Sequence, residues 1–442
     1  MRLVTLVTGD RQRWMGTARV LLRTRRARRR RDPGAALRAL ARGREDAVGL
    51  RIRGRHVLLV LDPGLAHELL AGHAADTVKG PGVQSTRSML GDGLLSSEGA
   101  AHARARRLVA PAFSPRRLDG YSAVFAQCTR DSMAGWADGE RRDMHAEIGA
   151  LTLRIAGLAL LGTDLSAQAP QVRADLEAAL TDWAGEGRDG DGTARASLHR
   201  LVDDILEQRR ETTSQDRGDV VSALLARSGI PDGFTAQEVH DHVMTLLLAG
   251  HETTAGALTW TLYLLARHPG VQDRLRGEAS LLDGQAPSAR DLPALRYTRA
   301  VLREAMRCYP PAWIIGRTLT ADLELGGWRL PAGSIAAVSP LLLHHDPRWY
   351  PGPEAFDPSR WLGKRLVPQH AYLPFGTGPR ACIGERFAWA EMTTVLAMLA
   401  QSWTFRIDPR FVAAPSYRVT LRPAGAIPMT LHATPRTLSW HG

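Results

Sequence analysis

The chain has 442 residues, 44% of them hydrophobic and 23% charged, which are ordinary values for a globular protein and leave ample length for a deep core. Its three cysteines, Cys128, Cys308 and Cys382, are odd in number and far apart, which excludes a disulfide framework and favours a reducing compartment. The formal net charge of +12 favours acidic partners, namely an acidic redox protein, an anionic membrane surface or nucleic acid. Specific nucleic-acid binding is not expected, because the sequence has no helix-turn-helix or zinc-finger pattern.

Neither a secretory signal nor a membrane span is expected. Leu3–Val7 is much shorter than the apolar part of a signal peptide, which needs about 7–15 residues. Val243–Ala266 is long enough to span a bilayer, but His251 and Glu252 lie at its centre, where each is costly in lipid. We expect a buried helix there and a soluble, cytoplasmic protein.

The first 45 residues are expected to form a basic N-terminal segment, partly disordered or a peripheral helix, ahead of one domain over residues 46–442. Met1–Leu22 is compatible with an amphipathic helix, and Arg23–Arg31 holds seven arginines in nine positions. The favoured interpretation of this tract is a solvated basic tail. Peripheral contact with anionic lipid is the alternative.

The next elements alternate between strands and helices. Val48–Ile52 and His56–Leu61 predict a β-hairpin, residues 63–70 predict a helix that begins at Pro63, and residues 79–99 predict a polar, Gly-rich loop.

A helix should follow that loop. His102 and Arg106 lie four residues apart on one face of it, a pattern that is more often a solvated basic face than a ligand set. The segment 184–192 has four glycines and is expected to be a flexible loop between two helices. Three further helices are predicted over Glu147–Gly162, Pro170–Trp183 and Ala194–Arg210.

A long apolar helix begins at the capping box Thr235–Glu238 and ends near His268. At about 1.5 Å per residue it would cross the whole molecule. Its middle, Ala249–Thr254, places a buried acid before a hydroxyl, which is costly unless both are used or satisfied. The pair His251-Glu252 does not complete a zinc motif, because position 255 is alanine. Gly250 is expected to weaken the helix locally and make room for a small ligand.

Residues 295–308 predict another helix, which carries Glu304 and Arg307 at i,i+3 spacing. Such a pair is common on helix surfaces and contributes little there. Strands are predicted beyond this helix, and the last of them are Thr404–Ile407, Arg418–Leu421 and Met429–His432. The turn between Pro423 and Pro428 is a further candidate for substrate contact.

Cys382 lies in a Gly- and Pro-rich loop just ahead of a helix predicted over Glu385–Leu399. Free backbone N–H groups and the helix dipole at that point are expected to lower the thiol pKa and favour the thiolate, which is the metal-binding form. The competing interpretation is that Cys382 is a small buried hydrophobic residue in a turn.

The residues around Cys382 suggest a flat cofactor. Gly378 and Gly384 let the backbone approach closely, Phe375 supplies apolar surface, and Arg380 supplies a cation for a carboxylate. One thiolate in such surroundings fits haem iron better than zinc, which needs four close ligands.

The pattern F-x-x-G-x-R-x-C-x-G over residues 375–384 resembles the cysteine loop of the cytochromes P-450, the haem-thiolate monooxygenases. Three further motifs occur in the family's order. Residues 249–253 resemble the oxygen-binding groove A-G-x-E-T, residues 304–307 resemble the E-x-x-R motif, and residues 356–361 resemble the segment whose arginine joins that motif. The resemblance runs from about Val48 to the C-terminus.

The resemblance implies a role for each matching residue. Cys382 would be the iron ligand, Thr253 would hydrogen-bond the oxygen co-substrate, and Glu252 would take part in proton delivery. Many family members have Trp at the position of His102. The other residues implied to contact the cofactor are His102, Arg106, Ala249, Gly250, Arg317, Phe375, Gly376, Arg380 and Gly384.

Further roles follow from the same resemblance. Glu304, Arg307 and Arg360 would form a structural network, and Trp313 and Ile314 would face the substrate. The segment 184–192 would belong to the lid over the substrate channel.

The fold that the resemblance implies is mainly α with a smaller β region (α+β), a triangular helical prism around buried haem b (iron protoporphyrin IX). The expected reaction inserts one atom of O2 into a C–H or C=C bond of a lipophilic small molecule of secondary metabolism. Electrons would come from NAD(P)H through a separate ferredoxin reductase and ferredoxin. A basic surface that includes Arg380 and Arg386 would suit an acidic ferredoxin, and we expect a monomer.

Three alternatives remain open at this point. They are a peroxide-driven or non-oxygenating haem-thiolate enzyme, a non-catalytic haem-thiolate sensor, and a basic membrane- or nucleic-acid-binding protein without haem.

Overall fold

A computed structural model describes residues 14, 24, 32–43, 46–52, 54–183, 192–211, 217–363 and 367–434. Three predicted features therefore lie largely outside the described residues. They are the amphipathic helix Met1–Leu22, the arginine tract Arg23–Arg31 and the Gly-rich segment 184–192.

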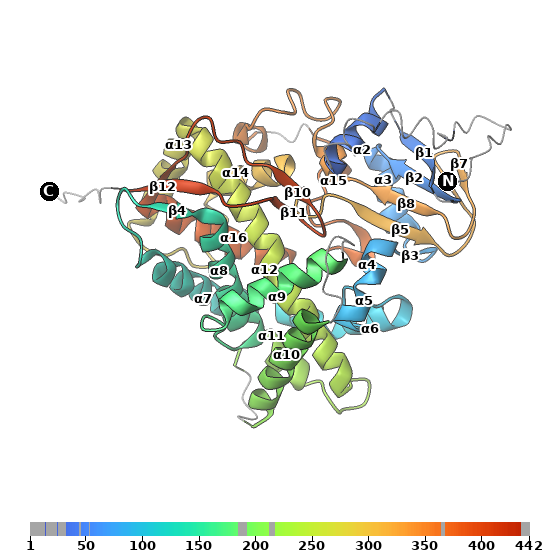
Figure 1. The fold of residues 1–442 in the computed structure, drawn as a ribbon, viewed down its shortest axis with the longest axis horizontal. Helices are drawn as coiled ribbons and strands as arrows, with labels where there is room; N and C mark the ends of the chain where they lie inside the picture. The colour runs from blue at the N-terminus through green and yellow to red at the C-terminus, as the bar shows by residue number, and fades with distance from the viewer. Residues whose placement is uncertain are drawn as a thin grey trace.

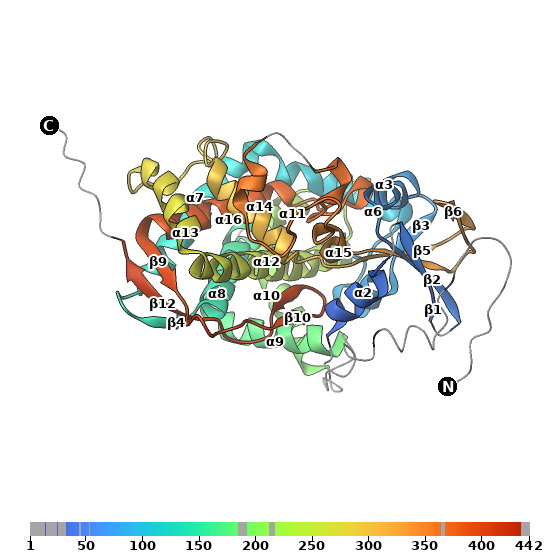
Figure 2. The same ribbon diagram turned by 90° about the horizontal axis from the view of Figure 1, so that it is seen from above.

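Helices make up most of the structure, and a smaller β-rich part lies at one side (Figure 1). Seen from above, α12 runs through the middle of the molecule with other helices on both sides of it (Figure 2). The predicted mainly helical fold with a smaller β region is confirmed. The helices are α2 Pro33–Ala41, α3 Pro63–His67, α4 Pro81–Ser85, α5 Arg87–Leu90, α6 Gly99–Val109, α7 Pro115–Met133, α8 Met144–Ala156, α9 Ala169–Trp183, α10 Thr193–Glu211, α11 Val220–Leu225, α12 Ala236–Arg267, α13 Pro269–Ala279, α14 Arg296–Cys308, α15 Pro340–His344 and α16 Glu385–Ser402.

The largest sheet joins segments from both halves of the chain. Its strands lie in the order β1-β2-β8-β5-β3. The predicted hairpin of β1 and β2 is antiparallel, and β2 then pairs in parallel with β8. The strands span β1 Ala47–Ile52, β2 Arg55–Val60, β3 Thr77–Lys79, β5 Ile315–Leu319 and β8 Ile335–Val338. A small hairpin is formed by β6 Leu323–Leu325 and β7 Trp328–Leu330.

The C-terminal strands differ in one respect from the expectation. The strand predicted over Arg418–Leu421 is wrong except at Leu421, because β10 Pro415–Tyr417 and β11 Leu421–Pro423 pair across a turn at residues 418–420. Residues 424–427 instead connect β11 to β12 Pro428–Ala433. That strand pairs with β4 Arg141–Asp143 and with β9 Trp403–Arg406.

The α12 helix has the start and the burial that its sequence predicts. The Thr235 hydroxyl accepts from the Glu238 N–H at 3.1 Å, and the Glu238 carboxylate accepts from the Thr235 N–H at 2.8 Å. Almost every residue from Val239 to Leu265 is buried. Gly250 packs against the segment after α8, where a Cβ would lie 2.4 Å from Leu160 Cδ1. Its missing side chain therefore serves close helix packing, rather than only making room for a ligand.

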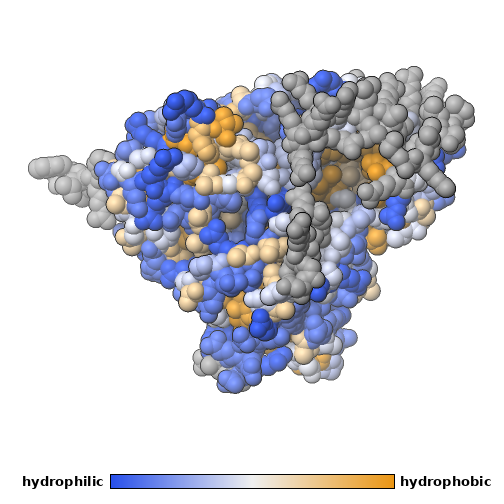
Figure 3. Space-filling view, in the orientation of Figure 1, coloured by the Kyte–Doolittle hydropathy of each residue, from blue (hydrophilic) through white to orange (hydrophobic). Residues whose placement is uncertain are grey.

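Among the described residues, one helical window is apolar and long enough to cross a membrane. It is Met144–Leu161, which comprises α8 and a π-helical turn, and 67% of it is buried inside the protein. The face of the molecule seen in Figure 3 is mostly hydrophilic, with smaller hydrophobic areas scattered over it, one of them toward the upper left.

The α2 helix packs on the domain although it belongs to the predicted N-terminal segment. Leu40 is buried in a small cluster with Val48 and Leu342. Gly34 lies so close to the Tyr417 ring that a Cβ there would be 2.3 Å from Cζ.

Candidate active site around Cys382

The cysteine loop is held in place by two glycines with left-handed backbones. Gly376 has φ 71° and Gly378 has φ 76°, a region that other residues rarely adopt. A Cβ on Gly378 would also lie 2.4 Å from the Leu70 carbonyl oxygen. The Cys382 N–H donates to the Phe375 carbonyl at 2.9 Å, and α16 begins three residues after the cysteine.

The Cys382 thiol is accessible in the loop just before α16. Its side chain is accessible, yet enough protein surrounds it that burial raises the pKa of the thiol to about 11. The Gly384 N–H lowers this pKa, but by less than burial raises it. The expectation of a lowered pKa is therefore wrong for the protein alone, because desolvation outweighs the start of the helix. A thiolate here requires a cation bound to the sulfur.

Arg380 is turned inward. Its side chain is 9% exposed and pairs with Glu98 at 2.8 Å. It also donates to the carbonyls of Ala74 at 2.8 Å and Thr77 at 2.7 Å. Arg380 therefore does not belong to the expected basic docking surface, whereas Arg386 is exposed.

Lys79 is a buried cation that the sequence did not single out. Its ammonium donates to the carbonyls of Ser97 at 2.6 Å and Leu94 at 3.1 Å. Burial lowers its pKa to about 8, although the nearby Glu98 opposes this shift. Its position at the start of an apparently polar loop gave no sign of burial; that loop in fact contains α4 and α5.

Three predicted ligand residues surround the same region. Arg106 donates to the Ala381 carbonyl at 2.7 Å, one residue from Cys382. Arg317 is 5% exposed, and its Nε has no hydrogen-bond partner among the described residues. Burial, with a smaller effect of Arg380, lowers the Arg317 pKa to about 10. Burial, assisted by Lys79 and Arg106, lowers the His102 pKa to about 4.

This group carries more positive charge than its own acid can balance. Lys79, Glu98, Arg106 and Arg380 each shift the pKa of His102. Glu98, Arg106, Arg317 and Arg380 each shift the pKa of Lys79, so these groups share one electrostatic environment. An excess of buried cations is costly unless an anion joins them. The cations are Lys79, Arg106, Arg317 and Arg380, and the carboxylate is Glu98.

The accessible thiol and this cationic cluster together fit haem. Haem offers iron for the sulfur and two propionates for the cluster, and Phe375 beside the cysteine supplies apolar surface. The donors and the charges therefore match the cofactor that the sequence predicts.

A short accessible stripe interrupts the buried α12 helix. Ala249 is exposed and Thr253 is half-buried, one turn apart on the same face. The Thr253 hydroxyl donates to the Ala249 carbonyl at 2.9 Å. The half-buried hydroxyl therefore still has lone pairs to accept a further hydrogen bond.

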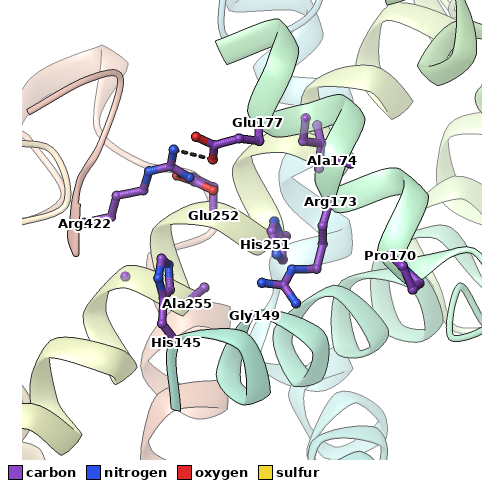
Figure 4. Close-up of a pocket in the computed structure, with 12 residues that line it drawn as sticks. His145, Gly149, Pro170, Arg173, Ala174, Glu177, His251, Glu252, Ala255 and Arg422 are labelled. Atoms are coloured by element: carbon purple, nitrogen blue, oxygen red, sulfur yellow. Dashed lines mark ion pairs between the residues drawn. The ribbon is translucent and has the colours of Figure 1, made fainter. Parts of the chain in front are cut away.

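Glu252 is held by the C-terminal hairpin. Its Oε1 accepts from the Thr420 hydroxyl at 3.0 Å and lies 3.3 Å from Arg422 Nη1. The sequence offered no sign of either partner, because both lie more than 150 residues further along the chain. Glu252 also lines a cavity of about 320 Å³ between α8, α9, α12 and β11 (Figure 4).

Glu304, Arg307 and Arg360 are brought together in the core. Arg307 donates to both oxygens of Glu304 at 2.9 Å, and Arg360 Nε donates to Oε1 at 3.2 Å. Trp361, which the sequence motif includes without a role, donates from its indole to Oε2 at 2.9 Å. The side chains of Glu304 and Arg307 are fully buried.

Trp313 and Ile314 lie near the β10–β11 hairpin. The Trp313 indole donates to the Arg418 carbonyl at 2.9 Å, and its ring lies 5.3 Å from the Tyr417 ring. Ile314 is 38% exposed. These residues can form an apolar wall.

Comparisons with known proteins agree with this site. The sequence profile of the cytochrome P450 family matches residues 187–424. Cyclooctatin synthase of Streptomyces melanosporofaciens is 39% identical over 411 residues, covering 87% of this chain and 88% of that protein. Cyclooctat-9-en-7-ol 5-monooxygenase of the same organism is 35% identical, covering 82% and 83%. Pentalenene oxygenase of Streptomyces avermitilis is 33% identical, covering 82% and 85%. The chain therefore belongs to the cytochrome P450 family of haem-thiolate monooxygenases.

Proposed function

We propose that this monooxygenase holds haem b through Cys382 and through the cationic cluster. The Cys382 thiolate would bind the iron, and His102, Arg106, Arg317 and Arg380 would bind the propionates. The observation that carries this proposal is an accessible thiol beside a buried group with four cations and one carboxylate. When bound, haem supplies the activation of O2 and the transfer of one oxygen atom to the substrate.

Residues of the apolar and structural parts support the same assignment. Phe375, Gly376, Gly384, Ala249 and Gly250 would line the two faces of the cofactor. The buried network of Glu304, Arg307 and Arg360 would fix α14 to the segment that precedes the cysteine loop.

Glu252 and Thr253 would manage protons on the oxygen side. The Thr253 hydroxyl already donates to the Ala249 carbonyl, so its oxygen can accept a hydrogen bond from a protonated neighbour. Glu252 borders the cavity between α8, α9, α12 and β11, and it would exchange protons with water there. The two side chains are adjacent in sequence and connect the cavity with the accessible stripe of α12.

The substrate proposed is a cyclic terpene or terpene alcohol. The names of the three Streptomyces relatives refer to pentalenene, cyclooctatin and cyclooctat-9-en-7-ol. Trp313 and Ile314 would provide the apolar contacts that such a molecule needs. A polyketide or fatty-acyl substrate is the alternative.

The remaining proposals concern partners and organisation. Electrons would pass from NAD(P)H through a ferredoxin reductase and a ferredoxin, which would dock on basic residues that include Arg386. We propose a cytoplasmic monomer whose folded domain begins near Pro33, since α2 is packed on the domain.

The ferrous carbon monoxide spectrum of the purified protein tests the haem assignment. We expect the band of a thiolate-ligated haem, and we expect Cys382→Ser to lose it. A wild-type spectrum without that band, or an unchanged spectrum in Cys382→Ser, would contradict the assignment. Titration with pentalenene should shift the spin state of the haem, whereas a fatty acid of similar size should not.

A further inference from the structure

Two arginines of the β10–β11 hairpin reach the same acid of α9. Arg418 Nη1 lies 2.9 Å from Glu177 Oε1, and Arg422 pairs with Glu177 Oε2. Arg422 continues to α12, where its other terminal nitrogen lies 3.3 Å from Glu252 Oε1. Figure 4 shows its guanidinium between the two carboxylates.

The two ends of this bridge lie in different environments. The side chains of Arg422 and Glu252 are 12% and 10% exposed, while that of Glu177 is 48% exposed. A charge pair acts more strongly where water is excluded, so Arg422 affects Glu252 more than Glu177. The Thr420 hydroxyl holds the same oxygen of Glu252, which leaves that carboxylate with two partners from one hairpin.

The cavity beside Glu252 has a mixed polar and apolar lining, and the charged side chains in it are balanced. Arg173 and Glu177 enter it from α9, His145 from α8, His251 from α12 and Arg422 from β11. The two arginines offset the two carboxylates, so water suits the cavity better than an ion.

His251 provides a second sign that the cavity holds water. It is 5% exposed, and neither ring nitrogen has a hydrogen-bond partner among the described residues. Burial lowers the His251 pKa to about 4 against the smaller opposing effect of Glu252, so the ring is neutral near pH 7. Water in the cavity can satisfy these nitrogens and reach Glu252.

We propose that Arg422 is a positioning residue that holds Glu252 at a water-filled cavity. Arg422 also pairs with Glu177 of α9, so α9 influences how firmly Arg422 holds Glu252. Glu252 takes one proton from cavity water for each proton that it passes toward Thr253, so the carboxylate returns to its ionised form. This inference rests on the proposed role of Glu252 in proton delivery.

The test compares three variants of the haem-loaded full chain. Arg422→Gln removes the cation from Glu252, Arg418→Gln removes a second cation of the same hairpin that binds Glu177 and Thr181, and Glu177→Gln frees Arg422 for Glu252. The antisymmetric stretch of the Glu252 carboxylate is followed by infrared difference spectroscopy, and its band is identified by its absence in Glu252→Gln.

The Glu252 carboxylate band is expected to move in Arg422→Gln, because an ion-pair partner 3.3 Å from Oε1 is removed. The band should keep its wild-type position in Arg418→Gln and move slightly the opposite way in Glu177→Gln. Arg422→Lys should restore part of the wild-type band position. The same band position in Arg422→Gln and Arg418→Gln would overturn the inference.

Peroxide release separates this inference from the proposed function. With NADPH and surrogate ferredoxin and reductase, Glu252→Gln and Arg422→Gln should both change the peroxide released per O2 consumed and enlarge the solvent isotope effect. An effect in Glu252→Gln without one in Arg422→Gln overturns the role of Arg422 alone. No effect in Glu252→Gln overturns the proton-delivery role itself, whatever the infrared band positions are.

Discussion

Replacing Glu304 by glutamine should destabilise the protein strongly, because this carboxylate accepts five hydrogen bonds in the core. Two come from Arg307, and one each comes from Arg360, Trp361 and the Asp357 N–H. The side chains of Glu304 and Arg307 are fully buried, so the change leaves a buried guanidinium without its counter-charge. The new amide N–H₂ also faces donors in place of one oxygen.

The magnitude follows from the buried pair. Removing one partner of such a pair costs about 3–5 kcal/mol. Taking about 2.1 cal/mol/K of unfolding entropy per residue, this cost lowers the Tm of a chain of this length by roughly 3–5 °C. Arg307 keeps its bonds to the carbonyls of His344, Pro353 and Ala355, which prevents a larger loss.

Calorimetry of the haem-loaded protein measures this effect, and haem retention on heating is recorded in parallel. Asp408→Asn is the matched control, since its partner Arg410 is 91% exposed and its removal should leave Tm unchanged. The error of such a Tm measurement is about 1 °C. If the Tm of Glu304→Gln lies within this error of the wild-type value, the view that a buried network supports the cysteine loop is refuted.

Three other changes test the packing at Gly250, the cationic cluster and the buried His251. Gly250→Ala should lower the free energy of unfolding, measured by urea denaturation, by about 1–3 kcal/mol, because its Cβ meets Leu160. The double variant Gly250→Ala/Leu160→Ala should lose less free energy of unfolding than the sum of the two single variants. Arg317→Met should weaken haem binding by roughly 10–100-fold in a haem-transfer assay. The apoprotein of Arg317→Met should melt at a higher temperature than the wild-type apoprotein, because burial lowers the Arg317 pKa and therefore makes this cation costly when haem is absent. An unchanged haem affinity in Arg317→Met would contradict the cluster assignment. The folded His251 pKa of about 4 lies below its ordinary 6.5, so the unfolded chain takes up more protons and stability should fall as the pH drops from 6.5 toward 4. His251→Leu should reduce this fall of Tm with decreasing pH. Identical profiles of Tm against pH in His251→Leu and the wild type would contradict the destabilising effect of His251.

The features that sequence predicted well are those set by local spacing. The capping box at Thr235 and Glu238 needs only three residues of separation, and it starts α12 as expected. The contact between Glu304 and Arg307 follows from i,i+3 spacing on one helix. The family pattern then supplied Arg360, whose contact no spacing could predict.

The features that sequence missed depend on tertiary contacts. Lys79 and Glu98 look like parts of a polar loop, and only the approach of Arg380 makes them a buried group. Arg422 reaches Glu252 from a distant hairpin. The thiol pKa of Cys382 was expected to fall because the local helix start was visible in sequence, whereas the surrounding protein that raises the pKa was not.

The parallel pairing of β2 with β8 has a consequence for synthesis on the ribosome. The β1–β2 hairpin emerges early, but the strand that completes it belongs to the last third of the chain. Until then one side of β2 offers unsatisfied N–H and C=O groups, the kind of edge that recruits strands from other molecules. Nascent chains stalled before Ile335 should therefore depend on chaperones, and slow translation of the central helices would lengthen that exposure.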